Sequence, residues 1–319
     1  MKPNKNEFIW SQKFRPMSIE DCILPDSIKS FLLNIVKQSE FQNLLLTGVQ
    51  GSGKTTAAKA LCNDIGLDYM MINASDENGI DVLRNKIKQY ASTVSIGMEN
   101  AHKVVILDEA DQLTNNVQSA LRSFMEEYSQ NARFILTANF KNRIISPLQS
   151  RCTSIDFGVP DFKTKAIMGQ MLHRLEDILK QEDVKYDKAV LAEIVFKWVP
   201  DFRRTINELQ KYSVKNSGVI DSGMLVSGSI EIDVKSLVKC LKEKNFKGMR
   251  EWVVEHGDLD ASTIFRRVYD NMREFLEPQS IPAVVLILGE YSYRSAFVVD
   301  QEINTTACMT EIMLKGKFK

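Results

Sequence analysis

Gly-Val-Gln-Gly-Ser-Gly-Lys-Thr, residues 48–55, is the most informative stretch of the chain. Its spacing, G-x-x-x-x-G-K-T, is typical of a phosphate-binding loop, and residues 43–46 before it and 56–61 after it predict a buried strand and a helix. Glycines let the backbone pass close to a polyphosphate, and the N–H groups of a helix N-terminus attract its charge. We therefore expect Lys54 to reach the outer phosphates of a nucleotide and the Thr55 hydroxyl to hold Mg²⁺.

The composition is that of an ordinary globular protein, and its net charge creates no long-range electrostatic field. The chain has 319 residues, of which 44% are hydrophobic and 26% charged, and its formal net charge is zero. Any contact with nucleic acid must therefore come from a local patch. The polar N-terminus, the lack of a bilayer-length apolar run and the lack of a C-x-x-C pair argue against export, a membrane span and a zinc site. Scattered cysteines then favour a reducing cytoplasm; they are Cys22, Cys62, Cys152, Cys240 and Cys308.

Strand and helix patterns alternate through the first half of the chain. Short apolar runs predict strands, and helical spacing of apolar residues predicts helices between them. This alternation predicts an α/β fold with a parallel sheet that is covered on both faces. The expected strands are residues 69–73, 103–107, 133–138 and 154–157, and the expected helices are residues 81–92 and 115–128.

The second half has a different pattern. Residues 162–212 show only helical periodicity, in about three segments that break near residues 182–183 and at Pro200. Residues 216–228 are rich in Gly and Ser and predict a linker. From residue 231 onward the spacing is again helical with nearly balanced charge, which favours packing or assembly over DNA binding.

An acidic motif follows the apolar run at residues 104–107. Asp108-Glu109-Ala110-Asp111 directly after a buried strand is the second half of a phosphate-loop ATPase site. Asp108 would hold Mg²⁺ through water, and Glu109 would orient the attacking water. The plainer alternative is an acidic helix cap. The four letters also suggest a DEAD-box helicase, but that class needs a Ser-Ala-Thr motif, which is absent from the sequence.

Three further polar residues occur in an informative order. Asn139 follows the strand at residues 133–138 and is a candidate phosphate sensor, although a turn residue is the alternative. Arg151 precedes the last strand, and Arg203 opens a helix of the second half. Each arginine alone fits a solvated surface position, so only their order after residues 48–55 and 108–111 carries information.

This order resembles that of the AAA+ ATPases and, among them, the sliding-clamp loaders. Ser150-Arg151-Cys152 is similar to the clamp-loader signature, as are residues 10–16, 73–77 and 200–204. Residues 23–25 and 121–126 look most like the loaders of T-even-type bacteriophages. The resemblance implies three parts: an AAA+ ATPase domain at residues 1–160, a helical lid domain at 161–228 and an all-helical collar that oligomerises at 229–319.

The resemblance also implies a nucleotide site with ATP and Mg²⁺. Arg203 would touch phosphates of its own subunit, whereas Arg151 would act on the ATP of a neighbour as an arginine finger. Thr55 and Asp108 would serve the metal, and Lys54, Glu109 and Asn139 would serve hydrolysis together with Arg151. The adenine and ribose would be bordered by Ser11, Gln12, Lys13, Phe14 and Ile23. The phosphates would be held by Gly51, Ser52, Gly53, Lys54, Thr55 and Thr56.

The implied partners are copies of the chain itself (a homotetramer), a small loader subunit, a sliding clamp and primer–template DNA. Arg84, Lys86 and Lys88 lie on the expected helix at residues 81–92, which lines the inner channel in clamp loaders. A charged solvent face is an equal alternative for these three. Related loaders often carry a basic residue where Asn78 stands, and the family is proposed to couple DNA binding to Glu109 through it. Because Asn78 is uncharged, we expect this switch to be either altered here or supplied by another residue. The expected compartment is the cytoplasm, that of the infected host if a phage encodes the chain.

Three functions fit these observations. The favoured one is a clamp-loader ATPase, in which ATP closes the ring on an open clamp and primed DNA triggers hydrolysis and release. A nucleotide-binding scaffold without catalysis is the second, but Lys54, Thr55, Asp108, Glu109 and Arg151 are all present. A branch-migration ATPase is the third, and the Ser-Arg-Cys element disfavours it.

Overall fold

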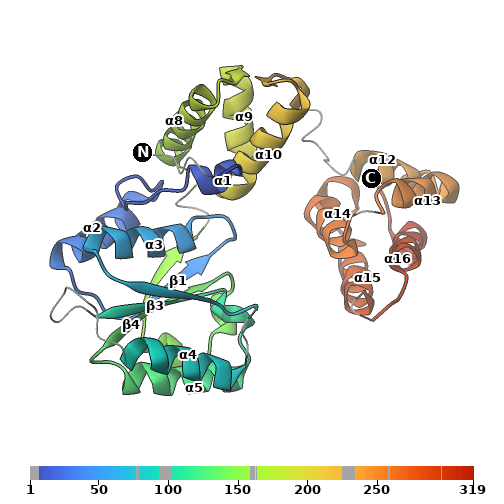
Figure 1. Cartoon of the computed structure of the whole chain (residues 1–319). Helices are drawn as coiled ribbons and strands as arrows, with labels where there is room; N and C mark the ends of the chain where they lie inside the picture. The colour runs from blue at the N-terminus through green and yellow to red at the C-terminus, as the bar shows by residue number, and fades with distance from the viewer. Residues whose placement is uncertain are drawn as a thin grey trace. The chain divides into compact units, whose positions relative to one another are not determined.

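A computed structural model describes residues 7–76, 79–92, 102–158, 162, 164–224, 234–257, 259–295 and 297–319. The chain divides into two compact units, residues 1–225 and residues 226–319. The first unit holds a sheet, its covering helices and a small helical subdomain, and the second unit is helical (Figure 1).

The first unit is built on a five-stranded sheet in which all neighbouring strands run parallel. The strand order is β2-β3-β4-β1-β5, so β1 lies between β4 and β5, and Leu45 of β1 is the register partner of Leu136 and Ser154. Parallel neighbours need crossover connections, and the helices between the strands supply them. The strands are β1 (Leu44–Gly48), β2 (Tyr69–Asn73), β3 (Lys103–Asp108), β4 (Ala132–Ala138) and β5 (Thr153–Phe157).

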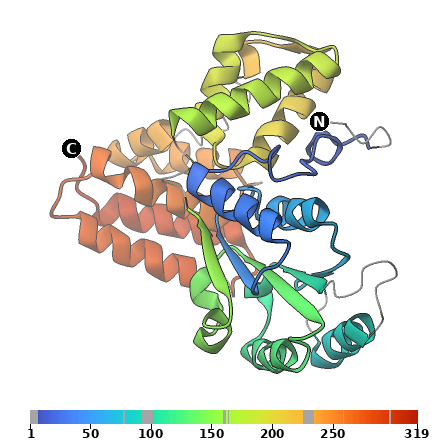
Figure 2. The same ribbon diagram turned by 90° about the vertical axis from the view of Figure 1, so that its left-hand side faces the viewer.

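Helices cover both faces of the sheet, as the apolar strand sequences require. Leu44, Leu46 and Ile106 belong to the core under α2 and α3, whereas Leu45 and Leu107 belong to the core under α4 and α5. Successive strand side chains thus point to opposite faces and both sets are buried. Figures 1 and 2 show the two helical layers. The helices are α2 (Asp26–Gln38), α3 (Lys54–Ile65), α4 (Ile80–Ser92) and α5 (Asn115–Glu127).

Helices make up most of the described part of the lid, the small subdomain that follows the sheet. A side chain caps the N-terminus of each helix: Thr164 accepts from Ile167 N–H, Asp187 from Ala189 N–H and Asp201 from Arg204 N–H. Phe162 is buried; its ring stacks on that of Phe157 and meets that of Phe202 at a tilt, each at 6.0 Å between ring centroids, so an aromatic row joins the last strand to the lid. The helices are α8 (Lys165–Gln181), α9 (Lys188–Trp198) and α10 (Phe202–Lys215).

The lid also corrects two expectations. A second, two-stranded parallel sheet pairs β6 (Lys185–Tyr186) with β7 (Val219–Ile220), although the sequence pattern predicts only helices and then a linker. Ile220 is 1% exposed and belongs to the core of the unit, so residues 216–224 are packed structure. Strands of two residues are too short to show a period of two, which is why the pattern misses them.

The N-terminal segment is held by the lid. Trp10 N–H donates to Gln210 Oε1 at 2.9 Å, and Gln210 Nε2 donates to Phe8 O at 2.8 Å. Helix α1 (Trp10–Lys13) therefore packs on α10, far from it in sequence. Short helices complete the unit: η1 (Ala110–Gln112), η2 (Lys141–Arg143) and α6 (Ser146–Gln149).

The second unit has a hydrophobic core of its own, which includes Leu241, Trp252, Phe265 and Met309. A single β-bridge joins Leu276 to Phe318 near its end. None of the helices in the described part of the chain combines the length and the apolar character that a bilayer span requires. The helices are α12 (Val234–Lys242), α13 (Phe246–Glu255), α14 (Ala261–Phe275), α15 (Ile281–Arg294) and α16 (Gln301–Lys315).

We expect Phe134→Ala to lower the free energy of unfolding of the first unit by about 3–5 kcal/mol, because Phe134 of β4 is 0% exposed and its removal leaves a cavity. Phe196→Ala is the matched control, since Phe196 lies on the lid at 73% exposure and its loss should cost less than about 0.5 kcal/mol. Urea unfolding followed by circular dichroism measures both. Equal shifts of the two midpoints would contradict the assigned core.

Candidate nucleotide-binding site

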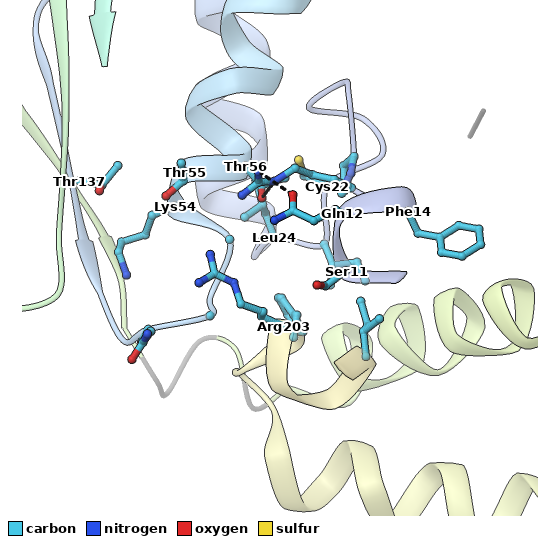
Figure 3. A pocket seen from close by; sticks show the side chains of 18 of the residues that line it. Ser11, Gln12, Phe14, Cys22, Leu24, Lys54, Thr55, Thr56, Thr137 and Arg203 are labelled. Atoms are coloured by element: carbon cyan, nitrogen blue, oxygen red, sulfur yellow. Dashed lines mark hydrogen bonds between the residues drawn. The ribbon is translucent and has the colours of Figure 1, made fainter. Parts of the chain in front are cut away.

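The candidate site lies where β1, β3 and β4 end, between the sheet and the lid. The two neighbours of β1, β4 and β5, lie on opposite sides of it. This switch in strand order leaves a crevice at the carboxyl ends of the strands, as it does in other open parallel sheets. Figure 3 shows side chains from the N-terminal segment, the loop after β1 and the lid around one cavity. The cavity is lined by Ser11, Gln12, Phe14, Arg15, Pro16, Cys22, Ile23, Leu24, Gln50, Gly51, Gly53, Lys54, Thr55, Thr56, Asp108, Glu109, Thr137, Ala138, Asn139, Met171, Arg174, Phe202, Arg203 and Ile206.

The loop of residues 48–55 has the backbone that its glycines predict. Gly53 caps α3 at φ 95°, and Gly51 has φ 76°, both in the left-handed region. A Cβ on Gly51 would stand 1.9 Å from Asp201 Oδ1, and Phe202 N–H donates to Gly51 O at 3.2 Å. The loop therefore packs directly on the first turn of α10. Ser52 is fully buried, and its hydroxyl donates to Val49 O at 2.8 Å.

Lys54 projects into the cavity from the start of α3. Its Nζ donates to Gly48 O at 2.8 Å, to Val49 O at 2.8 Å and to Asn139 Oδ1 at 2.9 Å. Burial lowers the pKa of Lys54 to about 8, although the Asp108 carboxylate opposes this shift. The Lys54 ammonium is thus largely removed from water and hydrogen-bonded to neutral oxygens. A bound anion would stabilise its charge more than these oxygens do.

Oxygen ligands gather beside the lysine. Thr55 Oγ1 donates to Asp108 Oδ1 at 2.6 Å, and Thr137 Oγ1 donates to the same oxygen at 2.5 Å. Carboxylate and hydroxyl oxygens are the ligands that Mg²⁺ prefers, usually with several waters. Thr137 also accepts from Glu109 N–H at 3.1 Å, so one strand-end threonine fixes both acidic residues. From sequence Thr137 is hidden, because it lies within the otherwise apolar strand pattern of residues 133–138.

Glu109 stands in a strained position. Its φ of 57° lies in the left-handed region, where a non-glycine residue is strained by about 1–3 kcal/mol, and such strain is often found at functional sites. Its carboxylate accepts a hydrogen bond from Ser75 Oγ, a residue just after β2. Ser75 lies within the motif at residues 73–77, but sequence reasoning gave it no role of its own. Asn78, the expected point of departure, lies outside the described residues.

Asn139 owes its direction to Asp111. The Asp111 carboxylate accepts from the backbone N–H groups of Asn139 and Phe140, both at 3.2 Å. This turn aims the Asn139 amide at Lys54. Asp111 is 5% exposed, so the fourth acidic letter of residues 108–111 serves the backbone and not the cavity.

The other end of the cavity is formed mainly by the N-terminal segment. Ser11, Gln12, Phe14 and Ile23 line it as expected, and Figure 3 shows the Phe14 ring well away from Lys54. Lys13 does not line it, because its ammonium pairs with Glu182 Oε1 at 2.6 Å.

Arg15 is a cavity residue that sequence reasoning missed. Its Nε donates to Thr56 Oγ1 at 3.1 Å and its Nη1 to Gln12 Oε1 at 3.4 Å. Burial, and then the nearby Arg203 guanidinium, lower its pKa. Arg203 reaches from the first turn of α10 toward the loop (Figure 3). For Arg15, the signal that the sequence offered was its place in the motif at residues 10–16.

These groups fit a magnesium-bound nucleoside triphosphate. Among the cations that line the cavity, Lys54, Arg15 and Arg203 lie near a loop whose glycines leave backbone room for phosphates. Asp108 and Thr55 supply hard oxygen ligands beside them. The mostly apolar end near Phe14 and Ile23 suits a base.

Arg151 is not brought into this cavity. It lies in the turn before β5, at the opposite edge of the sheet, beside a separate hollow that Phe31 and Arg133 also line. Its guanidinium pairs with Glu126 of its own chain. The structure therefore separates Arg151 from the nucleotide cavity of the same chain by the length of the strands.

The three candidate DNA contacts share one helix. Arg84, Lys86 and Lys88 are exposed on α4, whose opposite side buries Leu83 and Ile87. The Arg84 guanidinium lies over the Phe124 ring at 5.5 Å from its centroid, so part of this side chain packs on α5.

Sheet order, loop, acidic strand end and helical lid together define an AAA+ ATPase. A family model described as "ATPase family associated with various cellular activities (AAA)" matches residues 44–160, and one described as "Sliding-clamp-loader large subunit, AAA+ ATPase lid domain" matches residues 163–226. Similar solved structures include the RuvB branch migration motor of Thermotoga maritima, with a TM-score of 0.55 over 72% of this chain and 80% of that chain. Its identity is 19%, so this likeness concerns the fold alone.

Curated relatives identify the branch of the AAA+ class. The sliding-clamp-loader large subunit of Enterobacteria phage T4 is 36% identical over 99% of both chains, and that of Escherichia phage RB69 is 41% identical over 90% of both. The replication factor C small subunit of Sulfurisphaera tokodaii is 34% identical over 98% of this chain and 97% of the relative. The chain belongs to the sliding-clamp-loader family. The predicted family and the predicted AAA+ fold with helical lid and helical C-terminal region are confirmed, whereas the roles of single residues stay predictions.

We expect the affinity for ATP to fall as the pH rises above about 8, because the free Lys54 ammonium then begins to lose its proton. A phosphate beside Nζ favours the protonated form and raises this pKa in the complex, so binding must take up a proton. The loss should approach about tenfold per pH unit, and affinity should level off below pH 7.

Calorimetry between pH 7 and 9.5, in buffers of different ionisation enthalpy, measures both affinity and proton uptake. Lys59→Met is the control, since Lys59 lies farther along α3 outside the cavity lining and its loss should leave the pH dependence in place. An affinity that stays flat from pH 7.5 to 9.5 would refute the assignment of Lys54.

Proposed function

We propose that this clamp-loader AAA+ ATPase uses ATP to hold an open sliding clamp and releases the closed clamp on primer–template DNA when it hydrolyses the nucleotide. The observation that carries the proposal is the separation of Arg151 from the cavity of its own chain. A cavity that binds a triphosphate in one chain, with the arginine at the far edge of the sheet, suits a site shared between adjacent subunits.

The chemistry follows from the groups in the cavity. Lys54 and Arg203 would bind phosphate oxygens, and Thr55 and Asp108 would hold Mg²⁺. Bound there, Mg²⁺ would neutralise charge on the phosphates during transfer. Glu109 orients the attacking water and accepts its proton, and the hydrogen bond that Ser75 Oγ donates to Oε2 restrains the direction of this carboxylate.

The lid converts nucleotide binding into a change of shape. Gly51 and Phe202 share a backbone hydrogen bond, and Arg203 comes from the same turn of α10. A nucleotide held by both the loop and Arg203 favours one lid orientation, and loss of the terminal phosphate removes that preference. The ring arrangement then depends on the nucleotide through the lid.

The assembly that we propose contains four copies of this chain, a small loader subunit, the clamp and DNA, in the cytoplasm of the replicating or infected cell. The names of the relatives support loader subunits and a clamp as partners. A scaffold without catalysis is less well supported, because Lys54, Asp108, Glu109 and Asn139 all meet in the cavity. The alternative function, that of a branch-migration ATPase, is supported only by the likeness of the fold to RuvB.

The central test is the ATPase rate of the assembled loader with the clamp and primed DNA of the same source, each alone and both together. We expect the two additions together to raise the rate well above that of the loader alone. Glu109→Gln should bind ATP but turn it over at least about 10²-fold more slowly, because general-base catalysis is lost. The exposed Glu193 of the lid supplies the control, Glu193→Gln, with wild-type turnover. A rate that ignores clamp and DNA would sink the loader proposal.

Replacing Arg84, Lys86 and Lys88 by Glu should weaken binding of primer–template DNA and flatten its salt dependence. Each lost phosphate contact lowers the slope of log affinity against log salt by about 0.9. Fluorescence anisotropy on labelled primed DNA between 50 and 300 mM salt measures the slope, and an unchanged slope favours a solvated face. A matched triple reversal on the exposed lid surface is the control: Lys180, Lys211 and Lys215 to Glu.

A further inference from the structure

Arg151 is fixed by contacts within its own chain. Its Nε donates to Glu126 Oε1 at 2.8 Å, and Nη2 donates to the same oxygen. Its Nη1 donates to Pro147 O at 2.9 Å. Glu126 stands in the last turn of α5, and Pro147 belongs to α6, which packs against α5. Two elements therefore hold one guanidinium from two sides.

The chemistry of the guanidinium leaves it able to bind a further anion. An arginine side chain has five N–H donors, and these contacts use three of them. The Arg151 side chain is 34% exposed. Two of its N–H groups remain for a further anion, and the contacts with Glu126 and Pro147 already fix the position of the guanidinium. An unrestrained arginine gives up about 2 kcal/mol of rotamer entropy when it is fixed, and this arrangement reduces that cost before any partner arrives.

Other charged side chains near Arg151 have contacts of their own. Arg133, which lines the same hollow, donates through Nε to Phe41 O at 3.0 Å and lies 3.7 Å from Glu40. The adjacent Glu127 contacts Tyr128. Glu126 is thus the carboxylate that the described contacts place on Arg151.

We infer that Glu126 is a positioning residue: it holds Arg151 so that the two remaining N–H groups meet the terminal phosphate bound by an adjacent subunit. The inference rests on the proposed function, which gives Arg151 its role in a shared site. An ordinary surface ion pair contributes about 0–1 kcal/mol of stability and would have no effect on turnover. A misplaced catalytic group, in contrast, slows the chemical step by up to about 10²-fold while leaving nucleotide binding intact.

The test measures kcat and KM for ATP in the full loader with clamp and primed DNA, for complexes whose assembly is verified by mass measurement. Glu126→Ala should lower kcat by about 10–100-fold with KM changed less than about twofold. Glu126→Gln should lose less, because its amide oxygen can still accept from the guanidinium. Glu127→Gln is the matched control and should turn over like the wild type.

A double-mutant cycle separates positioning from other roles. If Glu126 acts through Arg151, the variant with both Glu126→Ala and Arg151→Ala should be no slower than Arg151→Ala alone. Wild-type kcat for Glu126→Ala, a further full loss in the double variant, or failure of Glu126→Ala to assemble would each overturn the inference. Wild-type turnover by Arg151→Ala would instead remove the shared site of the proposed function, so the two failures are distinguishable.

Discussion

Because all five strands of the main sheet run parallel, residues at the carboxyl ends of the strands gather at one edge of the sheet. Residues that precede the strands gather at the opposite edge. The loop of residues 48–55, Asp108 and Asn139 each lie at the carboxyl end of a strand, so they meet at one edge. Arg151 precedes β5 and stands at the other edge, where α5 ends. No side chain can cross a strand of five residues, about 16 Å long. The topology itself therefore prevents the chain from supplying Arg151 to its own cavity.

Desolvated charge is the second constraint on the site. Lys54, Arg15 and Arg203 face one cavity, and burial lowers the pKa of the first two. Holding such cations away from water costs free energy that an anionic ligand restores. Because Arg203 belongs to the lid and Lys54 to the sheet, the ligand that relieves this cost also joins the two parts. A ligand that contacts both groups would therefore couple its own binding to the orientation of the lid.

Sequence reasoning predicted whatever depends on a local pattern. The run at residues 103–107 predicts a buried parallel strand, and Gly51 and Gly53 predict the loop. It missed contacts that only tertiary packing creates. Arg15 lies in a quoted motif, but its bond to Thr56 spans 41 positions. The two-residue strands β6 and β7 have no period to detect, and they fold because they pair with each other.

If α4 binds DNA as we propose, the hydrogen bond from Ser75 to Glu109 lies between that contact and the site of hydrolysis. Ser75 follows β2 and precedes α4, the helix that carries Arg84, Lys86 and Lys88. Ser75 Oγ donates to Oε2 of Glu109, whose left-handed backbone is already strained, so this hydrogen bond sets the direction of the carboxylate. If DNA binds α4, a shift of Ser75 would turn the Glu109 carboxylate relative to the nucleotide cavity. Coupling between the two sites would then depend on whether this hydrogen bond is made or broken.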